Sequence, residues 1–539
     1  MIGPQGYDYV IVGAGSAGCL LADRLSADGA SVLVIEAGGP DRDPLIHVPI
    51  GVGKLHQHRL HDWGYDTEIE PGLSNRAIES MRGKVIGGSS SINVMAHVRG
   101  NRGDYDRWAA SGCAGWSYDD ALPYFKRYED WQGGPDTWRG AGGPLTVTRP
   151  ENADPFVPAL LAAAQEAGYA VTPDYNGESQ DGFSRGQSTI RDGRRCSAAV
   201  AFLRPALARG KVTLVQNAHA GRVLLDGTRA LGIEYASGGH MQRAFAEREV
   251  ILAAGVFNTP QLLMLSGIGP ASHLREHGIA PVVDLPGVGG NLQDHLAVTL
   301  GFARREPGPF PALMRADRAA VAMARAYLFG TGPATVLPGG VTAFIKTRTD
   351  LAVPDIQFFT RGTAIDADWW FPGWRRQFAD GFSFTPVLLH PEARGRLYLR
   401  SANPRDKMRI VHNFLGHEND LRSFRAGIRA ARDLAAKPAL DRFRGEERVP
   451  GAGVASDAEI DEWVRRTARS AHHPSCTCAM GVGEDAVLDT DLRVRGVDRL
   501  RVVDASAMPD MVSGNINACV LMIAEKASDL IRGRPNARA

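Results

Sequence analysis

The chain opens with a pattern of apolar and small residues that predicts a strand, a tight turn, a helix and a second strand. Residues 9–12 form a short apolar run, the turn GAGSAG follows at 13–18, and a second apolar run at 32–35 ends in Glu36. In such a unit the first glycine permits the turn, the second lets the backbone approach a pyrophosphate, and the third allows close helix packing. The pattern therefore predicts a dinucleotide-binding unit, with Glu36 placed for a ribose hydroxyl.

Further elements follow from the periodicity of the later sequence. Strands are predicted at 212–216, 220–225, 230–235 and 249–254, close enough together for an antiparallel meander that returns to the first sheet. Helical spacing marks 104–131, 156–167, 420–435 and 457–468, and strands of another sheet are predicted at 355–360 and 382–390. Near the end, a strand from 499 ends in Asp504 and a helix follows at 517–531. Ligands bind at the carboxyl ends of such strands, so Asp504 and this helix are expected beside Gly13.

The order of these elements predicts a mixed α/β fold with two domains interleaved in sequence. A Rossmann-like nucleotide-binding domain would comprise residues 1–100, 190–297 and 485–539. A second, substrate-binding domain, built on an antiparallel sheet flanked by helices, would comprise 101–189 and 298–484. A chain of 539 residues is long enough for both.

Composition narrows the classes of function. The 61 Lys and Arg nearly balance the 60 Asp and Glu, so no overall field favours nucleic acid or an anionic membrane. No apolar run is long enough for a transmembrane segment. Six cysteines do not resemble a disulfide framework, and Cys476 and Cys478 lack the spacing of a zinc site, so no metal is expected. The first strand begins too early to leave room for a signal sequence, which favours a cytoplasmic location.

Two segments carry candidate chemistry. His472 and His473 precede Pro474, and the ordinary pKa of histidine suits proton transfer near neutral pH, although paired histidines are more often structural than catalytic. The second segment, DADWWFPGWRRQF at 366–378, is densely aromatic. It is consistent with a lid, a pocket wall, a partner surface or an ordinary loop packed on its own domain.

Taken together, five ordered motifs resemble the glucose-methanol-choline (GMC) flavoprotein oxidoreductases over nearly the whole chain. The motifs are GAGSAG with Glu36, RGKVIGGSSSIN at 82–93, GVFNTPQLLMLSGIGP at 255–270, LPGVGGNLQDH at 285–295 and VVDASAMP at 502–509. A softer resemblance is to the L-sorbose, polyethylene glycol and choline dehydrogenase-like members. The family resemblance implies FAD as the cofactor.

The same resemblance implies which residues hold FAD. The ADP half would contact Gly13, Gly15, Gly18 and Glu36, the adenine side Val223, and the flavin Arg82, Gly88, Ser89, Asn93, Val94 and Ala96. Asp504 and Ala505 would close the diphosphate and isoalloxazine contacts, and Ser16, Ala17, Ala37, Met95, His472 and Asn515 are further implied contacts. Some relatives attach FAD covalently through a histidine whose place Ile92 takes here, so a dissociable cofactor is predicted.

By resemblance, His473 and Asn517 are the catalytic pair. His473 would remove the proton of a substrate hydroxyl as hydride passes to flavin N5, and Asn517 would orient that hydroxyl. The expected partners are a small alcohol, polyol or sugar and an electron acceptor, either a quinone or other carrier or O2. A dehydrogenase is favoured over an oxidase of aromatic or pyridoxine-like alcohols. A hydroxynitrile lyase and, from the turn alone, an NAD enzyme stay open, and no aromatic and acidic cage for choline is evident.

Overall fold

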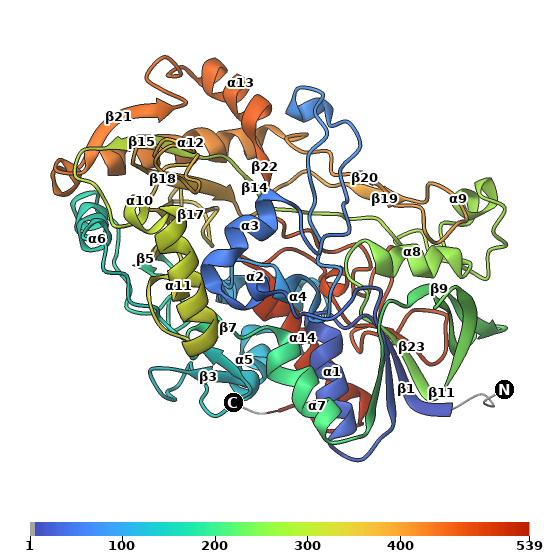
Figure 1. Ribbon diagram of the computed structural model, residues 1–539. Helices are drawn as coiled ribbons and strands as arrows, with labels where there is room; N and C mark the ends of the chain where they lie inside the picture. The colour runs from blue at the N-terminus through green and yellow to red at the C-terminus, as the bar shows by residue number, and fades with distance from the viewer. Residues whose placement is uncertain (1–5, 538–539) are drawn as a thin grey trace.

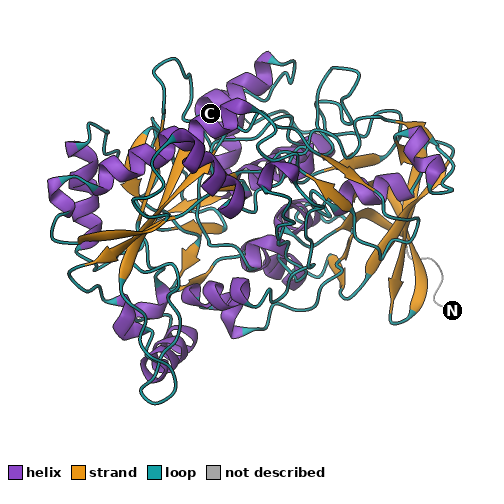
Figure 2. Cartoon of the chain, turned by 90° about the horizontal axis from the view of Figure 1, so that it is seen from above, coloured by secondary structure: helices purple, strands orange, loops and turns teal. Residues whose placement is uncertain are grey.

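The computed structural model describes residues 6–537 and contains two large sheets, set apart with helices and loops between and around them (Figure 2). The first sheet has the order β8-β2-β1-β11-β10-β9, with β23 beside β11. Its strands are β1 Gly6–Val12, β2 Val32–Ile35, β8 Val212–Val215, β9 His219–Asp226, β10 Arg229–Ser237, β11 His240–Leu252 and β23 Leu500–Val502. Pairing is antiparallel between β9, β10 and β11 and parallel elsewhere, which confirms the predicted Rossmann-like sheet and its returning meander.

The second sheet is antiparallel, as predicted, and has the order β21-β15-β18-β17-β16-β5, with β14 pairing β18 and β22. Its strands are β5 Gly182–Arg185, β14 Leu296–Ala297, β15 Leu300–Arg304, β16 Val341–Ile345, β17 Ile356–Arg361, β18 Gly381–Leu388, β21 Arg444–Val449 and β22 Arg469–Ser470. Three helices, α6 Phe156–Glu166, α12 Glu418–Ala435 and α13 Asp457–Thr467, bury apolar side chains in one core with it. Within β17, Ile356 and Phe358 belong to this core. Because side chains alternate along a strand, Gln357 lies on the opposite face of the sheet.

Two helices that fall inside the expected substrate-binding range pack instead on the core of the first sheet. They are α4 Arg102–Ala110 and α5 Tyr118–Tyr128, whose Tyr105, Trp108 and Phe125 are buried in that core. Both begin with a capping box, at Asn101 and Ser117. The domain boundary expected near residue 100 from the sequence therefore does not mark the point where the chain leaves the core of the first sheet.

The described part of the chain contains further helices of at least eight residues: α1 Ser16–Ser26, α8 Asn258–Leu265, α11 Ala316–Phe329 and α14 Asn517–Ile531. Between residues 6 and 537, no helix combines the length and apolar character that a bilayer crossing requires. All six cysteines are free thiols buried in the protein.

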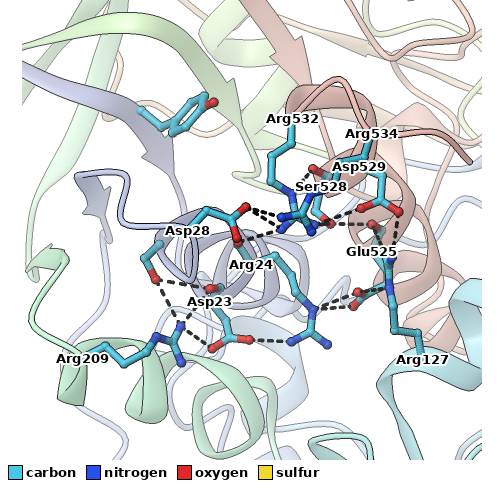
Figure 3. Close-up of polar contacts among 12 residues, drawn as sticks. Asp23, Arg24, Asp28, Arg127, Arg209, Glu525, Ser528, Asp529, Arg532 and Arg534 are labelled. Atoms are coloured by element: carbon cyan, nitrogen blue, oxygen red, sulfur yellow. Dashed lines mark hydrogen bonds and ion pairs between the residues drawn. The ribbon is translucent and has the colours of Figure 1, made fainter. Parts of the chain in front are cut away.

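α1 and α14 come from opposite ends of the chain and lie side by side (Figure 1). The buried carboxylate of Glu525 on α14 accepts hydrogen bonds from Arg24 of α1 at 2.8 Å and from Arg127 of α5 at 2.6 Å (Figure 3). At the other end of the pair, the Ser16 hydroxyl donates to Oδ1 of Asn517 at 2.7 Å. The two helix N-termini are thereby held together.

Replacing Glu525 by Gln should destabilise the protein, because Arg24 and Arg127 would then lack their shared carboxylate in a buried place. We expect a loss of about 3–5 kcal/mol in the free energy of unfolding, measured as a lower urea midpoint by tryptophan fluorescence. Glu462→Gln is the matched control. Glu462 is exposed on α13, and its carboxylate lies 3.6 Å from the guanidinium of Arg466 on that helix. Its midpoint should hardly move, and equal midpoints for the two variants would contradict the assignment.

Candidate active site

A cavity of about 1080 Å3 is lined by residues of both sheets and of the loops that join them. Most of the residues expected to hold a cofactor or substrate line it: Gly13, Gly15, Ser16, Ala17, Glu36, Ala37, Arg82, Gly88, Ser89, Asn93, Val94, Met95, Ala96, His472, His473, Asp504, Ala505, Asn515 and Asn517. Segments separated by up to five hundred positions in the sequence thus form one site. Gly18 and Val223 lie outside this lining.

These two residues have structural surroundings of their own. A Cβ on Gly18 would lie 1.9 Å from the carbonyl oxygen of Gly13, so this glycine allows close packing of the helix on the turn. Val223 is buried in the middle of β9, and its amide donates to the Ser266 hydroxyl at 2.8 Å. Residues 218–220, at the start of the same segment, line the cavity where the sequence had suggested Val223.

One end of the cavity has the chemistry of a dinucleotide site. Gly15, the N-cap of α1, makes no side-chain capping bond, and the space where its Cβ would be is open, so the helix amides are accessible to a diphosphate. The Glu36 carboxylate accepts the amides of Ala14 and Gly38 at 2.7 Å each, and its burial raises its pKa. A carboxylate has further lone pairs for ribose hydroxyls. These residues fit the ADP half of FAD.

At the catalytic end, His473 stands in a chain of hydrogen bonds that fixes its tautomer. Nε2 of His295 lies 2.9 Å from the carbonyl oxygen of Leu389, which can only accept, so this nitrogen carries the proton. In neutral His295, Nδ1 is then an acceptor, and Nδ1 of His473, 3.0 Å away, must donate to it. The lone pair of His473 is left on Nε2, 3.0 Å from the amide nitrogen of Asn515.

The surroundings keep both imidazoles neutral. Burial lowers the pKa of His295 to about 3. Burial is the largest cause that holds the pKa of His473 well below its usual value, and the positive charge of Arg82 acts in the same direction. Asp294 fixes the backbone here, accepting the His473 amide at 2.8 Å and the Ser470 hydroxyl at 2.5 Å. A neutral His473 thus carries its acceptor lone pair on Nε2, the atom through which an imidazole can accept a proton.

The two neighbouring candidates have different contacts. His472 has a positive φ of 62°, its carbonyl accepts a hydrogen bond from Arg82, and burial lowers its pKa to about 3. Asn515, rather than Asn517, contacts His473. The Oδ1 of Asn517 is held by Ser16, and its NH2 group has no partner among residues 6–537 although Asn517 lines the cavity.

The aromatic segment at 366–378 forms a wall of the cavity, the second of the four roles considered for it. Asp368 and Trp369 line the cavity, and Nζ of Lys54 lies 2.7 Å from Asp368 and 4.7 Å from the centre of the Trp369 ring. Trp374 is 68 % exposed. The segment therefore joins α3 Val52–Gln57 to the second sheet across the cavity.

His295 makes the hydrogen bond to His473, and the sequence analysis left it without a role. The available signal was its position, since an Asp-His pair directly follows the glycine-rich loop of the motif at 285–295. Its distance of 178 residues from His473 hides the contact.

Comparison with known proteins agrees with this architecture. Family models described as GMC oxidoreductase match residues 7–297 and 391–524. An oxygen-dependent choline dehydrogenase of Brucella ovis is 45% identical over 536 residues, covering 99% of this chain and 97% of that protein. A protein of the same name from Photobacterium profundum is 42% identical over 532 residues, covering 98% of this chain and 93% of that one.

Solved structures give the same family. Pyridoxine 4-oxidase from Mesorbium loti has a TM-score of 0.88 and 32% identity, with 98% of this chain and 100% of that chain covered. A formate oxidase of Aspergillus oryzae, studied for FAD modification, has a TM-score of 0.89 and 27% identity, with 98% of each chain covered. The family and the FAD of the formate oxidase support FAD as the cofactor. The chain belongs to the GMC oxidoreductases.

Proposed function

We propose that this GMC oxidoreductase oxidises a CH–OH group to an aldehyde or ketone with His473 as the general base. The observation that carries the proposal is the hydrogen-bond chain from Leu389 through His295, which leaves Nε2 of His473 unprotonated at the cavity. Nε2 accepts the hydroxyl proton, and the loss of that proton raises the electron density at the carbon that is to be oxidised. FAD, held by the residues that line the nucleotide end of the cavity, would supply the hydride acceptor.

Two asparagines would act around this base. Asn515 donates to Nε2 of His473 at 3.0 Å, so a substrate hydroxyl has to take its place before proton transfer. Asn517 lies at the N-terminus of α14 with its Oδ1 fixed by Ser16, which leaves its NH2 group to orient the hydroxyl. The uncapped N-terminus of α14 also favours negative charge that develops beside it.

The remaining features of the reaction follow from the family and the cavity. The dehydrogenase names of the relatives favour a dehydrogenase over an oxidase, and the oxidoreductase names of relatives and neighbours favour redox chemistry over a lyase. Ile92 offers no nucleophile to FAD at the cavity wall, which supports non-covalent binding. A cytoplasmic location remains a prediction.

Replacing His473 by Ala should slow flavin reduction by an alcohol roughly 10²–10⁴-fold, because proton removal from the hydroxyl loses its base. The rate is measured by anaerobic stopped-flow absorbance of the purified holoenzyme. His240→Ala, on an exposed part of β11, is the control and should react at the wild-type rate. Reduction of His473→Ala at the wild-type rate would refute its role.

Replacing His295 by Leu should lower kcat about 10²-fold with little change in KM, because nothing would then hold the proton of His473 on Nδ1. In His295→Asn, a side-chain oxygen close to the position of Nδ1 can still accept that proton, so kcat should recover. Recovery separates a positioning role from simple damage to the core. Equal kcat values for Leu and Asn would count against the hydrogen-bond chain.

Denaturing the holoenzyme should release all flavin from the chain, since Ile92 takes the place of the attaching histidine. The test is acid precipitation followed by absorbance of the supernatant and pellet near the flavin band. Yellow colour that stays with the precipitated chain would overturn non-covalent binding.

A further inference from the structure

Two arginines on the substrate side of the cavity lack any counter-charge. Arg361, at the end of β17, and Arg469, in β22, both line the cavity. Within residues 6–537, neither guanidinium makes a hydrogen bond or an ion pair. On the same wall, by contrast, Lys54 and Arg375 both bind Asp368. The guanidiniums of Arg361 and Arg469 thus differ from these two neighbouring cations in having no carboxylate partner among the described residues.

The second sheet places both arginines on the cavity that His473 also lines. In β17, Gln357, Phe359, Thr360 and Arg361 line the cavity, whereas Ile356 and Phe358 belong to the core. Gln357 lies at the inner end of this row, with its Nε2 3.4 Å from Oδ1 of Asn515, the neighbour of His473. Arg469 precedes His473 by four residues and pairs with Ala297 across β14 and β22. Both cations therefore line the same cavity as His473.

The charges of these arginines reach the groups around them. Burial, and then the charge of Arg469, lowers the pKa of Arg361. The charge of Arg361 contributes to the lowered pKa of His56, and that of Arg469 to the lowered pKa of His472. Both arginines are exposed to the open cavity, so water solvates their charges, and an anion bound between them lowers the repulsion that remains.

The carboxylates of the cavity do not supply that anion. Glu36 and Asp504 lie at the nucleotide end and bind backbone amides. Asp368 is shared by Lys54 and Arg375, and Glu79 lies 3.9 Å from Nε2 of His472. Asp366 is exposed and makes no ion pair among the described residues.

We infer that the substrate is an alcohol that carries an oxyanion, a carboxylate or phosphate, bound by Arg361 and Arg469 while its hydroxyl meets His473. Guanidinium groups match the geometry of such oxyanions with paired hydrogen bonds. The same two charges disfavour a quaternary ammonium, so the cavity selects against choline, the compound in the names of the relatives. This inference rests on the proposed alcohol oxidation.

Matched alcohols test the charge preference. One set is 4-(hydroxymethyl)benzoate, 4-(hydroxymethyl)phenyl phosphate, benzyl alcohol and a 4-trimethylammonium benzyl alcohol; the other is 4-hydroxybutanoate, 1-butanol and (3-hydroxypropyl)trimethylammonium. For the holoenzyme, we expect kcat/KM of an anionic member to exceed that of its neutral partner by at least about tenfold, with the cation slowest. The carboxylate and phosphate arms decide between the two oxyanions. A neutral or cationic alcohol preferred in both sets would overturn the inference while leaving alcohol oxidation intact.

Variants of the arginines test the residues. Arg361→Gln and Arg469→Gln should each raise KM for the anionic alcohol about tenfold or more and leave the neutral alcohol unchanged. Arg361→Lys, which keeps the charge, should recover part of the loss. Arg466→Gln, on the exposed side of α13, is the control and should behave as wild type. An equal effect of the Gln variants on anionic and neutral alcohols would contradict the assignment.

A binding measurement separates this inference from the proposed reaction. Benzoate should shift the absorbance spectrum of the bound flavin saturably in the wild type and much more weakly in Arg361→Gln. If no alcohol of any charge reduces the flavin, the proposed oxidation fails, and the benzoate titration still decides the anion site. Equal benzoate affinity in wild type and Arg361→Gln would refute that site.

Discussion

The site depends on the packing of α1 against α14. These helices begin 501 residues apart, yet the Ser16 hydroxyl and Asn517 Oδ1 meet at 2.7 Å and Glu525 joins Arg24 to Arg127 behind them. Each N-terminus presents free amides and the positive end of a helix dipole to the same cavity. The nucleotide end and the proposed catalytic end of the cavity therefore rest on the same pair of packed helices. A shift of either helix would change the geometry of both ends.

The hydrogen-bond chain at His473 illustrates how a fixed backbone group can set the direction of proton transfer. A carbonyl oxygen has no proton to give, so the bond from Leu389 to His295 has one possible polarity. A neutral imidazole has one donor and one acceptor nitrogen. His295 donates to Leu389 through Nε2, so its Nδ1 accepts, and Nδ1 of His473 has to donate to it. Burial keeps both rings neutral and preserves the arrangement. In the proposed mechanism, the residues around His473 thus decide which of its nitrogens accepts the proton.

The local parts of this architecture could be predicted from the sequence, and the long-range parts could not. Gly13, Gly15 and Glu36 belong to one short strand-turn-helix-strand unit, and the structure places them as expected. The meander of β9, β10 and β11 followed from strand spacing. Val223 lies outside the cavity lining whereas residues 218–220 belong to it, because only strand pairing decides which end of β9 reaches the cavity.

The placement of charged side chains in the cavity also depends on long-range contacts that the sequence does not reveal. A formal net charge of +1 indicates an electrically balanced protein. Equal numbers of positive and negative side chains in the whole chain do not require equal numbers in the cavity, however. Many carboxylates are paired with arginines elsewhere, as Asp461 is with Arg425. In β17, period-2 alternation turns Arg361 away from Ile356 and Phe358 and toward the cavity, while Arg469 arrives from a strand more than one hundred residues later. Only the fold brings them to one cavity, where their two positive charges act together on an incoming substrate.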